Sequence, residues 1–427
     1  MEERTTEERS TDTDRVQLQS TRLAQRYQRA WFQDLRRRVF EEGVPYALTS
    51  ATTPHEVLDV FEIPYVTNEW WSSLVAAKRA SGHYLDRLEE RGFHNGLPHY
   101  GAMALAALLD KDNPNAPWGG LPRPALLCAR LVDQGTERLW SLMAEACGAP
   151  FVPIEVPGST VLYPRWWEMA RRNWEDVFET HRIDRVVGCF RELVAECERI
   201  TGRRFDEERL RALLERVHEQ EECFDEVRRL ICEAPKLPVR LSEQLTNVMT
   251  AQWHRGSDWA LEHARRFRDE VRERVEAGVA AFPDERIRLG WVGVGLWQNT
   301  DFYRAFEESH GAVFVRSMYL SIASDGYLRY GLRDPLRALA GRYASFNETL
   351  HVAPWLPEWT VADCRRHRCH GAVIVNLGSA VKFTQRALEA AGIPTLVLDA
   401  DAIDTRGWDE GRMRRVMAEF LERRLGA

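Results

Sequence analysis

Two cysteines and two histidines lie within seven residues in the segment CRRHRCH, at positions 364–370. Thiolate and imidazole groups hold zinc and iron in proteins, so this segment is a candidate metal site. A structural zinc site takes four ligands, usually as two separated pairs, and no second pair lies nearby. In a helix that ends here, Cys364 and His367 share one face, whereas Cys369 points elsewhere. His370 directly precedes an apolar run. The spacing therefore favours a solvated helix end ahead of a strand over a metal site.

A second group of reactive side chains lies in the segment HNGLPHYG, residues 94–101, which carries His94, His99 and Tyr100. Imidazole and phenol groups can transfer protons, and loops on a rigid scaffold often carry function. A lone histidine is nevertheless more often structural than catalytic. Ser50 ends a predicted strand, where its hydroxyl could contact a ligand or cap the next helix. Both interpretations stay open for each of these residues.

Carboxylates follow another predicted strand, because Asp399, Asp401 and Asp404 lie at and just beyond the end of PTLVLDA. They could hold a ligand hydroxyl or cap the next helix, and capping is the favoured interpretation. Gly293 and Gly295 in WVGVGLW lack the third glycine of a dinucleotide-binding fingerprint. These two glycines are therefore interpreted as close-packing positions at a strand end.

Tryptophan is unusually frequent, with fifteen residues that include the adjacent pairs Trp70-Trp71 and Trp166-Trp167. Such pairs supply a large aromatic area at little rotamer cost. They could form a flat wall for a planar ligand or pack in the core. Packing is the favoured interpretation, because tryptophan is usually buried.

Composition limits the class of protein. The chain has 427 residues, 44% hydrophobic and 29% charged, which is typical of a soluble globular protein with two or three packed units. Its net charge of −7, from 58 basic and 65 acidic residues, argues against a nucleic-acid surface. No apolar stretch approaches the roughly 20 residues that span a membrane. The polar start resembles no secretory signal, and eight cysteines without a disulfide spacing suit the cytoplasm.

Strands and helices alternate in the first part of the chain. A charged amphipathic helix is expected over 17–43, and strands over 46–50, 63–68, 124–130 and 150–156. Helical patterns separate these strands. Alternation at this pace predicts a parallel sheet with helices on both faces.

The pattern becomes helical from about 160 to 280, where apolar residues recur three and four apart. A second alternating unit then follows, with strands expected over 286–297, 311–320, 371–377 and 394–400. The predicted fold class is α/β, with two Rossmann-like parallel-sheet domains and a helical region between them. The predicted boundaries are a disordered tail 1–15, a first α/β domain 16–160, a helical region 161–285 and a second α/β domain 286–427.

Three segments, taken in order and spacing, resemble one known family. They are TSATTPHEVLDVFEIPYVTNEWWSSLVAAK (49–78), TGRRFDEERLRALLERVHEQ (201–220) and GAVIVNLGSAVKFTQRALEAAGIPTLVLDADAID (371–404). Over nearly its full length the chain resembles the 2-hydroxyacyl-CoA dehydratase and benzoyl-CoA reductase family. The resemblance implies a heterodimer of two homologous subunits, typically each with a [4Fe–4S] cluster on three cysteines. It also implies an ATP-hydrolysing activator and reduction of an acyl-CoA thioester to a ketyl radical, which leads to loss of water or to ring reduction.

The three cysteine positions that the resemblance implies hold other residues in this chain. The first falls within GLPHYGAMAL (96–105), the second at Gln134, and the third at Ser379 and Ala380. Cys128 lies too early, inside a predicted strand. Because cluster iron needs thiolate or comparable ligands, the chain itself is expected to hold no cluster, whereas a partner subunit could hold one.

A cleft that has lost its cluster can keep its substrate. In this interpretation His99 and Tyr100 carry protons and Glu69 serves as a base. The expected substrate contacts are Ser50, Trp70, Trp71, Gln134 and Ser379.

Three functions stay open. The leading hypothesis is a cluster-less subunit that pairs with a homologous subunit in a dehydratase or reductase complex on an acyl-CoA thioester, with an aromatic acyl group as one option. The second is a non-redox acid–base enzyme, a hydratase, lyase or isomerase, on a CoA thioester. The third is a structural subunit without catalysis. None of the three involves nucleic acid or a membrane.

Overall fold

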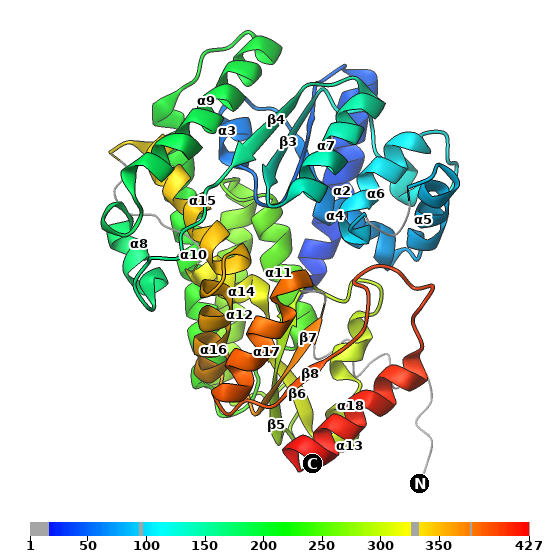
Figure 1. The fold of residues 1–427 in the computed structure, drawn as a ribbon, viewed down its shortest axis with the longest axis vertical. Coiled ribbons are helices and arrows are strands. Elements are labelled where there is room, and N and C mark those ends of the chain that lie inside the picture. Colours follow the sequence, from blue (N-terminus) through cyan, green and yellow to red (C-terminus); the bar gives the residue numbers. More distant parts are fainter. Residues whose placement is uncertain (1–16, 94–96, 326–332, 376–377, 427) are drawn as a thin grey trace.

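The apolar runs of the first half form one parallel sheet (Figure 1). The computed structural model describes residues 17–93, 97–325, 333–375 and 378–426. The strand order is β2-β1-β3-β4, and the bounds are β1 Ala47–Thr49, β2 Tyr65–Thr67, β3 Leu126–Leu131 and β4 Phe151–Glu155. β1 and β2 are fully buried, whereas β4, at one edge, alternates between more and less buried residues. All three strand pairs are parallel, as the alternation of strands and helices predicts.

Polar side chains begin two of the helices that follow these strands. Thr67 accepts a hydrogen bond from the Trp70 amide at the start of α4, and Asp133 accepts one from the Thr136 amide at the start of α7. These helix N-termini therefore lie at the carboxyl edge of the sheet. The elements of this half are α2 Gln19–Glu41, α3 His55–Val60, α4 Asn68–Ala77, α5 Ser81–Glu90, α6 His99–Leu109, η1 Pro117–Gly119 and α7 Gln134–Cys147.

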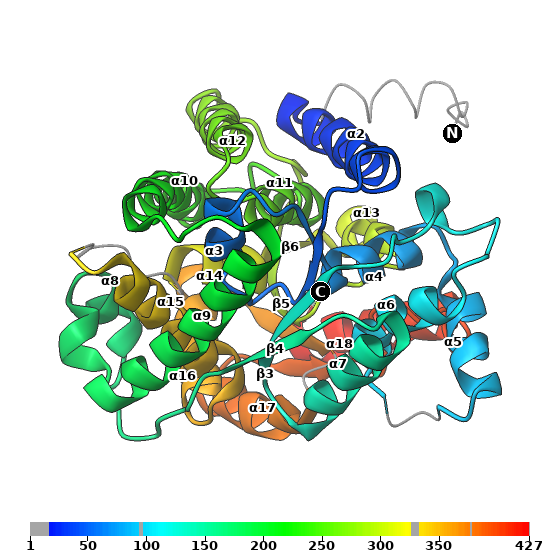
Figure 2. The same ribbon diagram turned by 90° about the horizontal axis from the view of Figure 1, so that it is seen from above.

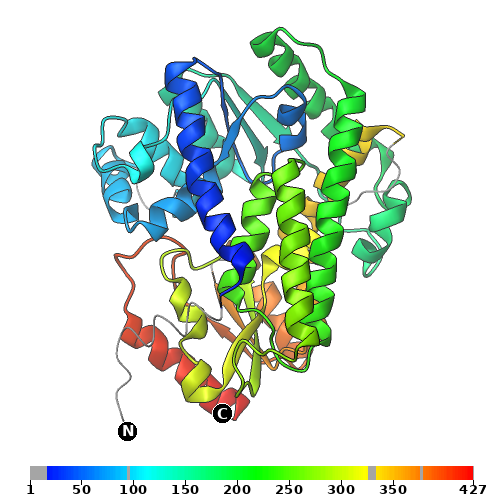
Figure 3. The same ribbon diagram turned by 180° about the vertical axis from the view of Figure 1, so that it is seen from behind.

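The middle of the chain is helical, as its apolar spacing predicts. Its helices are α8 Trp166–Val177, α9 Thr180–Thr201, α10 Glu207–Glu233, α11 Leu241–Trp253 and α12 Asp258–Glu276. α10 and α12 pack along each other, and α2 lies against α11 and α12 (Figure 3). The N-terminal helix is therefore part of the helical layer, far from its neighbours in sequence.

The second half repeats the architecture with strand order β6-β5-β7-β8, all parallel. The strands are β5 Ile287–Gly293, β6 Ala312–Arg316, β7 Gly371–Val375 and β8 Thr395–Val397. The helices are η2 Thr300–Arg304, α13 Glu307–His310, α14 Met318–Asp325, α15 Pro335–His351, α16 Trp355–Arg366, η3 Gly378–Ala380, α17 Val381–Ala390 and α18 Glu410–Leu425. The predicted fold class, two Rossmann-like parallel sheets with helices between them, is confirmed.

Two predicted strands extend too far. The strand predicted over 286–297 ends at Gly293. The apolar run 311–320 ends as a strand at Arg316, and α14 begins at Met318. Ser317 explains the early end, because its hydroxyl accepts a hydrogen bond from the Leu320 amide at 3.3 Å and so caps the new helix. The apolar residues after position 317 therefore belong to a buried helix.

The helix end at 364–370 is confirmed, and Arg365, Arg366, Arg368 and His370 are exposed there, but one face of it is buried. α16 ends at Arg366, and Cys364 and His367 are both fully buried. Asp363, which precedes Cys364, accepts a hydrogen bond from Arg316 Nε at 2.6 Å and lies 3.3 Å from His367 Nδ1. These opposite charges compensate one another inside the core, which the sequence spacing alone does not reveal.

The two sheets lie one above the other along the long axis, with helices on both sides of the strands (Figures 1 and 2). The loop between β8 and α18 reaches the first half, where the Ser81 hydroxyl donates to the Ile403 carbonyl at 2.7 Å. Val294 and Trp297, which follow β5, pack against the core of the first half. The carboxyl ends of both sheets therefore approach the same region. Within the described residues, no helix is long and apolar enough to cross a membrane.

Candidate functional site

Glu69 lies where the carboxyl ends of the strands meet, in the first turn of α4 after β2. The Ala51 amide, just beyond β1, donates to Glu69 Oε2 at 2.8 Å. Burial raises the pKa of Glu69 from 4.5 to about 7, against these backbone hydrogen bonds and against the charge of Arg130. A carboxyl group with this pKa is present in both protonation states near neutral pH, as an acid–base group requires.

Tyr100 lies beside Glu69 in the first turn of α6. Its hydroxyl donates to the Glu69 carbonyl at 3.2 Å, and its own carbonyl accepts from the Ser72 hydroxyl at 2.6 Å. Burial, with the charges of Tyr319 and Glu69, raises the Tyr100 pKa well above its usual value. The phenol therefore stays protonated at neutral pH and can donate a hydrogen bond.

The second half supplies an aromatic surface opposite these two residues. Trp297 follows β5, Tyr319 lies in α14 after β6, and their rings are 5.7 Å apart. The Gly295 amide donates to the Tyr319 hydroxyl at 3.0 Å, and a Cβ at Gly295 would lie 2.8 Å from the Trp297 ring. The interpretation of Gly295 as a close-packing glycine is confirmed.

Ser50 lies beside this region, but its hydroxyl is occupied within the protein. It is 6% exposed, lies 2.8 Å from the Thr53 hydroxyl and accepts from the Arg130 amide at 3.2 Å. Ser50 thus closes a tight turn after β1 and fixes the end of β3, which favours its local structural role.

His99 is engaged in a contact between the two halves. Its Nδ1 lies 3.0 Å from Asp401 and 3.7 Å from Asp404. The hydrogen bond to Asp401 raises the His99 pKa. Asp401 also accepts from the amides of Ile403 and Asp404, so it caps a turn, whereas the N-cap of α18 is Asp409. The predicted capping role therefore applies to this turn and not to the next helix.

The side chains of the other predicted contacts do not join the Glu69 carboxyl group and the Tyr100 hydroxyl in one site. Trp70 and Trp71 are 1% and 0% exposed and pack around Phe32, which favours packing over a ligand wall. Gln134 is exposed at the start of α7. Ser379 lies in η3, but its side chain, like all of His94, is outside the described residues.

Sequence reasoning missed Arg130, the arginine that ends the apolar run PALLCAR, as well as Trp297 and Tyr319. Arg130 is 1% exposed near the end of β3. Its guanidinium donates to Thr52 and to Asn347 of α15. A charged residue inside an otherwise apolar strand is the signal that could have identified it.

The cysteines do not form the donor set that an iron–sulfur cluster needs. All eight are free, and they lie within β3, in α7, α9, α10 and α16, or just before β7, so none follows the carboxyl end of a strand. Among the described residues, no three His, Cys, Asp or Glu side chains are placed to hold a metal ion. The residues at the three expected positions thus do not fit a [4Fe–4S] cluster.

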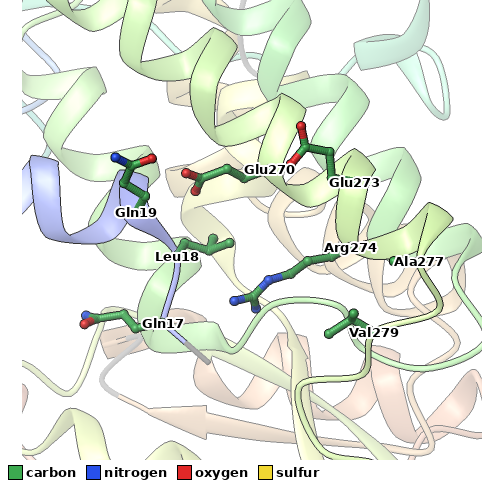
Figure 4. Close-up of a pocket in the computed structure, with 8 residues that line it drawn as sticks. All are labelled: Gln17, Leu18, Gln19, Glu270, Glu273, Arg274, Ala277 and Val279. Atoms are coloured by element: carbon green, nitrogen blue, oxygen red, sulfur yellow. The ribbon is translucent and has the colours of Figure 1, made fainter. Parts of the chain in front are cut away.

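Two surface hollows lie away from the strand ends. One of about 270 Å³ is lined by Leu18, Glu270 and Arg274 among others, between the start of α2 and the end of α12 (Figure 4). A larger one of about 510 Å³ lies between α3 and α10. No predicted site residue lines either hollow, whereas His99 lines a third and much smaller one of about 10 Å³ beside Leu97.

Fold and site together define a class of protein with two parallel α/β units whose strand ends share one polar and aromatic region. Residues 51–423 match the family model described as 2-hydroxyglutaryl-CoA dehydratase, D-component. The chain therefore belongs to this dehydratase family, which confirms the resemblance seen in the sequence.

Two curated proteins are similar over most of their length. The chain is 20% identical to the alpha subunit of (R)-2-hydroxyisocaproyl-CoA dehydratase of Clostridioides difficile over 391 residues, which is 90% of each chain. It is 19% identical to the alpha subunit of (R)-phenyllactyl-CoA dehydratase of Clostridium sporogenes over 390 residues, 87% of this chain and 88% of that protein.

Proposed function

We propose that this chain is a subunit of a dehydratase-type or reductase-type complex that acts on an acyl-CoA thioester and holds no iron–sulfur cluster itself. The observation that carries the proposal is the position of Glu69. In a member of this family, a carboxyl group with a pKa of about 7 lies at the shared strand ends, in a residue whose main-chain carbonyl accepts a hydrogen bond from the Tyr100 hydroxyl.

The partner in this proposal is a homologous subunit, which can supply a cluster. Two relatives are named as alpha subunits, which supports an assembly of several chains. If a cluster is present in the partner, it supplies the electron chemistry, and this chain binds and orients the acyl group. Trp297 and Tyr319 give an aromatic acyl group a surface to stack on.

Glu69 and Tyr100 define what this chain contributes to the chemistry. Near neutral pH, the Glu69 carboxylate can accept a proton from the substrate, and its neutral form can return one to a leaving oxygen. Tyr100, which stays protonated, donates a hydrogen bond and holds the Glu69 segment through the carbonyl at 3.2 Å. These roles need only residues of this chain.

A second function is favoured by the same carboxyl group. An acid–base hydratase, lyase or isomerase on a CoA thioester needs a base that titrates near neutral pH, which Glu69 provides. Such an enzyme would need neither an activator nor a strong reductant. Turnover that depends on ATP and a reductant would instead favour the complex with a cluster-bearing partner.

Titration of the purified chain, alone and co-expressed with a homologous subunit, tests the proposal. Hexanoyl-CoA, benzoyl-CoA and free CoA serve as probes, with intrinsic tryptophan fluorescence as the signal. We expect both thioesters to bind more tightly than free CoA, and Glu69→Gln to abolish turnover of the complex. Glu145→Gln, an exposed position in α7, is the matched control. Absence of thioester binding in both preparations would overturn the proposal, and full activity of Glu69→Gln would favour a structural subunit.

A further inference from the structure

Seven arginines are buried within the described residues, and six of them face a carboxylate. The six pairs are Arg182–Glu348, Arg228–Asp325, Arg255–Glu56, Arg288–Glu285, Arg316–Asp363 and Arg342–Glu221. Arg130 is the exception, because it forms no ion pair with any described residue. A buried charge without an opposite charge is unfavourable in a protein interior. Its retention at a strand end indicates a role other than stability.

The hydrogen bonds of Arg130 hold it in place and leave one nitrogen free. Nε donates to the Thr52 hydroxyl at 3.1 Å and Nη1 donates to Asn347 Oδ1 at 2.8 Å. The Arg130 amide donates to the Ser50 hydroxyl at 3.2 Å. Nη2 is buried and has no hydrogen-bond partner. The guanidinium is thus oriented by neutral groups, and an oxygen atom of a ligand can accept from Nη2.

The internal segments outside the described residues do not offer a carboxylate for Arg130. Residues 94–96, 326–332 and 376–377 read HNG, GYLRYGL and NL, without aspartate or glutamate. Glu69 does interact with Arg130, since each charge shifts the pKa of the other group. Glu69 makes no hydrogen bond to the guanidinium, and near neutral pH it is ionised only part of the time.

We propose that Arg130 binds the carbonyl oxygen of the acyl-CoA thioester through Nη2 and stabilises the negative charge that develops on this oxygen. The inference rests on the proposed function. When Glu69 takes a proton from the carbon beside the thioester, the C–H electron pair forms a carbon–carbon double bond. The carbonyl π pair moves onto the oxygen. Negative charge then passes from Glu69 to the oxygen beside Arg130, and the total charge of the site stays constant.

A carboxylate on the acyl chain is a poorer ligand for Arg130 than the carbonyl oxygen. It would bring a permanent negative charge close to Glu69 and oppose the ionisation of that base. The carbonyl oxygen is neutral until Glu69 has become neutral by accepting the proton. The electrostatic interaction between Glu69 and Arg130 therefore favours an oxygen whose charge develops during the reaction.

Binding of three CoA derivatives tests this assignment in the full chain, with its partner subunit present. Hexanoyl-CoA carries the carbonyl oxygen, S-hexyl-CoA is the thioether without it, and glutaryl-CoA adds a carboxylate. We expect Arg130→Gln to weaken the binding of hexanoyl-CoA by about tenfold, which is the effect of one lost charge-assisted hydrogen bond. Binding of S-hexyl-CoA should change by less than about twofold, because the lost contact is to the carbonyl. Arg130→Lys should restore part of the preference for hexanoyl-CoA over S-hexyl-CoA.

A second variant keeps the test decisive if Arg130→Gln does not fold. Asn347→Asp places a carboxylate where Nη1 already donates, so it should neutralise Arg130 and remove the same preference for the thioester. Equal losses for hexanoyl-CoA and S-hexyl-CoA, or no loss, would overturn the inference and leave the proposed function intact. A loss of binding confined to glutaryl-CoA would overturn the inference and indicate that Arg130 binds a carboxylate of the acyl chain. If the wild-type protein binds none of the three, the proposed function itself fails.

Discussion

Replacing Glu69 by glutamine should remove a pH dependence from the stability of the protein. Burial raises the Glu69 pKa from 4.5 to about 7 in the folded chain. Below pH 4.5 the group is protonated in both the folded and the unfolded chain and contributes no difference. As the pH rises from 4.5 to 7, the unfolded chain ionises first, so the free energy of unfolding falls. Above pH 7 the full destabilisation is present.

The magnitude follows from the size of the pKa shift. A shift from 4.5 to about 7 corresponds to about 3–4 kcal/mol at about 1.4 kcal/mol per pKa unit. Because Glu69 is partly exposed, screening by solvent reduces the expected effect to about 1–2 kcal/mol. The free energy of unfolding of Glu69→Gln minus that of the wild type should therefore increase by this amount from pH 5 to pH 8.

Urea unfolding of the wild type and of Glu69→Gln at pH 5 and pH 8 measures this difference. Glu145→Gln, exposed on α7, controls for the general effect of removing one carboxylate, and its effect should be equal at both pH values. An unchanged difference between the wild type and Glu69→Gln would refute the raised pKa. A difference of opposite sign would mean that the charge of Arg130 outweighs burial.

Three other predictions follow from the ion pairs and the cysteines. Arg316→Met should lower the free energy of unfolding by about 3 kcal/mol, because it leaves Asp363 without the Arg316 charge in the core. Arg130→Met should lower it by only about 1–2 kcal/mol, the contribution of two hydrogen bonds. Equal losses of the two variants in urea unfolding would contradict this difference between a paired and an unpaired arginine. Asp401→Asn should lower the free energy of unfolding at pH 6 by less than about 1 kcal/mol. This loss should vanish as the pH rises through the raised His99 pKa, because the imidazole then becomes neutral. A loss that persists at high pH would contradict the ion pair between His99 and Asp401. Iron and acid-labile sulfide should be absent from the anaerobically purified chain alone, and cluster stoichiometry there would contradict the expected loss of ligands.

The sequence predicts the architecture well, because periodicity is a local property. Apolar runs bounded by turns located all eight strands of the described residues, and spacing of three and four residues located the middle helices. The strand ends were less predictable, as the run 311–320 illustrates. A single hydroxyl, Ser317, changes the structure there from strand to helix. The packing of α2 against α11 and α12 was not predictable, since no local pattern specifies which distant face an amphipathic helix covers.

The site was only partly predictable, because its geometry depends on contacts between the two halves. The segment 94–101 points to Tyr100 and the expected substrate cleft to Glu69, and in the structure the Tyr100 hydroxyl donates to the Glu69 main-chain carbonyl. The partners of His99 depend on a loop about 300 residues away. The apolar run before Arg130 is a sequence signal for this residue, but an arginine at the end of a strand is usually exposed. The fold shows in addition that it is buried and forms no ion pair with a described carboxylate.

The buried pair Arg255–Glu56 connects stability to the site, and breaking it should change both. Arg255 Nε lies 2.7 Å from Glu56, and Nη2 donates to the Thr53 carbonyl at 2.7 Å. The Thr53 hydroxyl contacts Ser50 at 2.8 Å, and Ser50 in turn accepts from the Arg130 amide at 3.2 Å.

Glu56→Gln leaves Arg255 buried without its carboxylate partner, which should destabilise the chain by about 3–5 kcal/mol. Because the turn that holds Arg130 then loses its anchor, the preference for hexanoyl-CoA over S-hexyl-CoA should also fall, at a temperature where the variant is fully folded. Circular dichroism establishes that condition before the titration. If Glu56→Gln loses stability but keeps the full thioester preference, the position of Arg130 does not depend on this chain of hydrogen bonds, and the strand β3 alone must hold it.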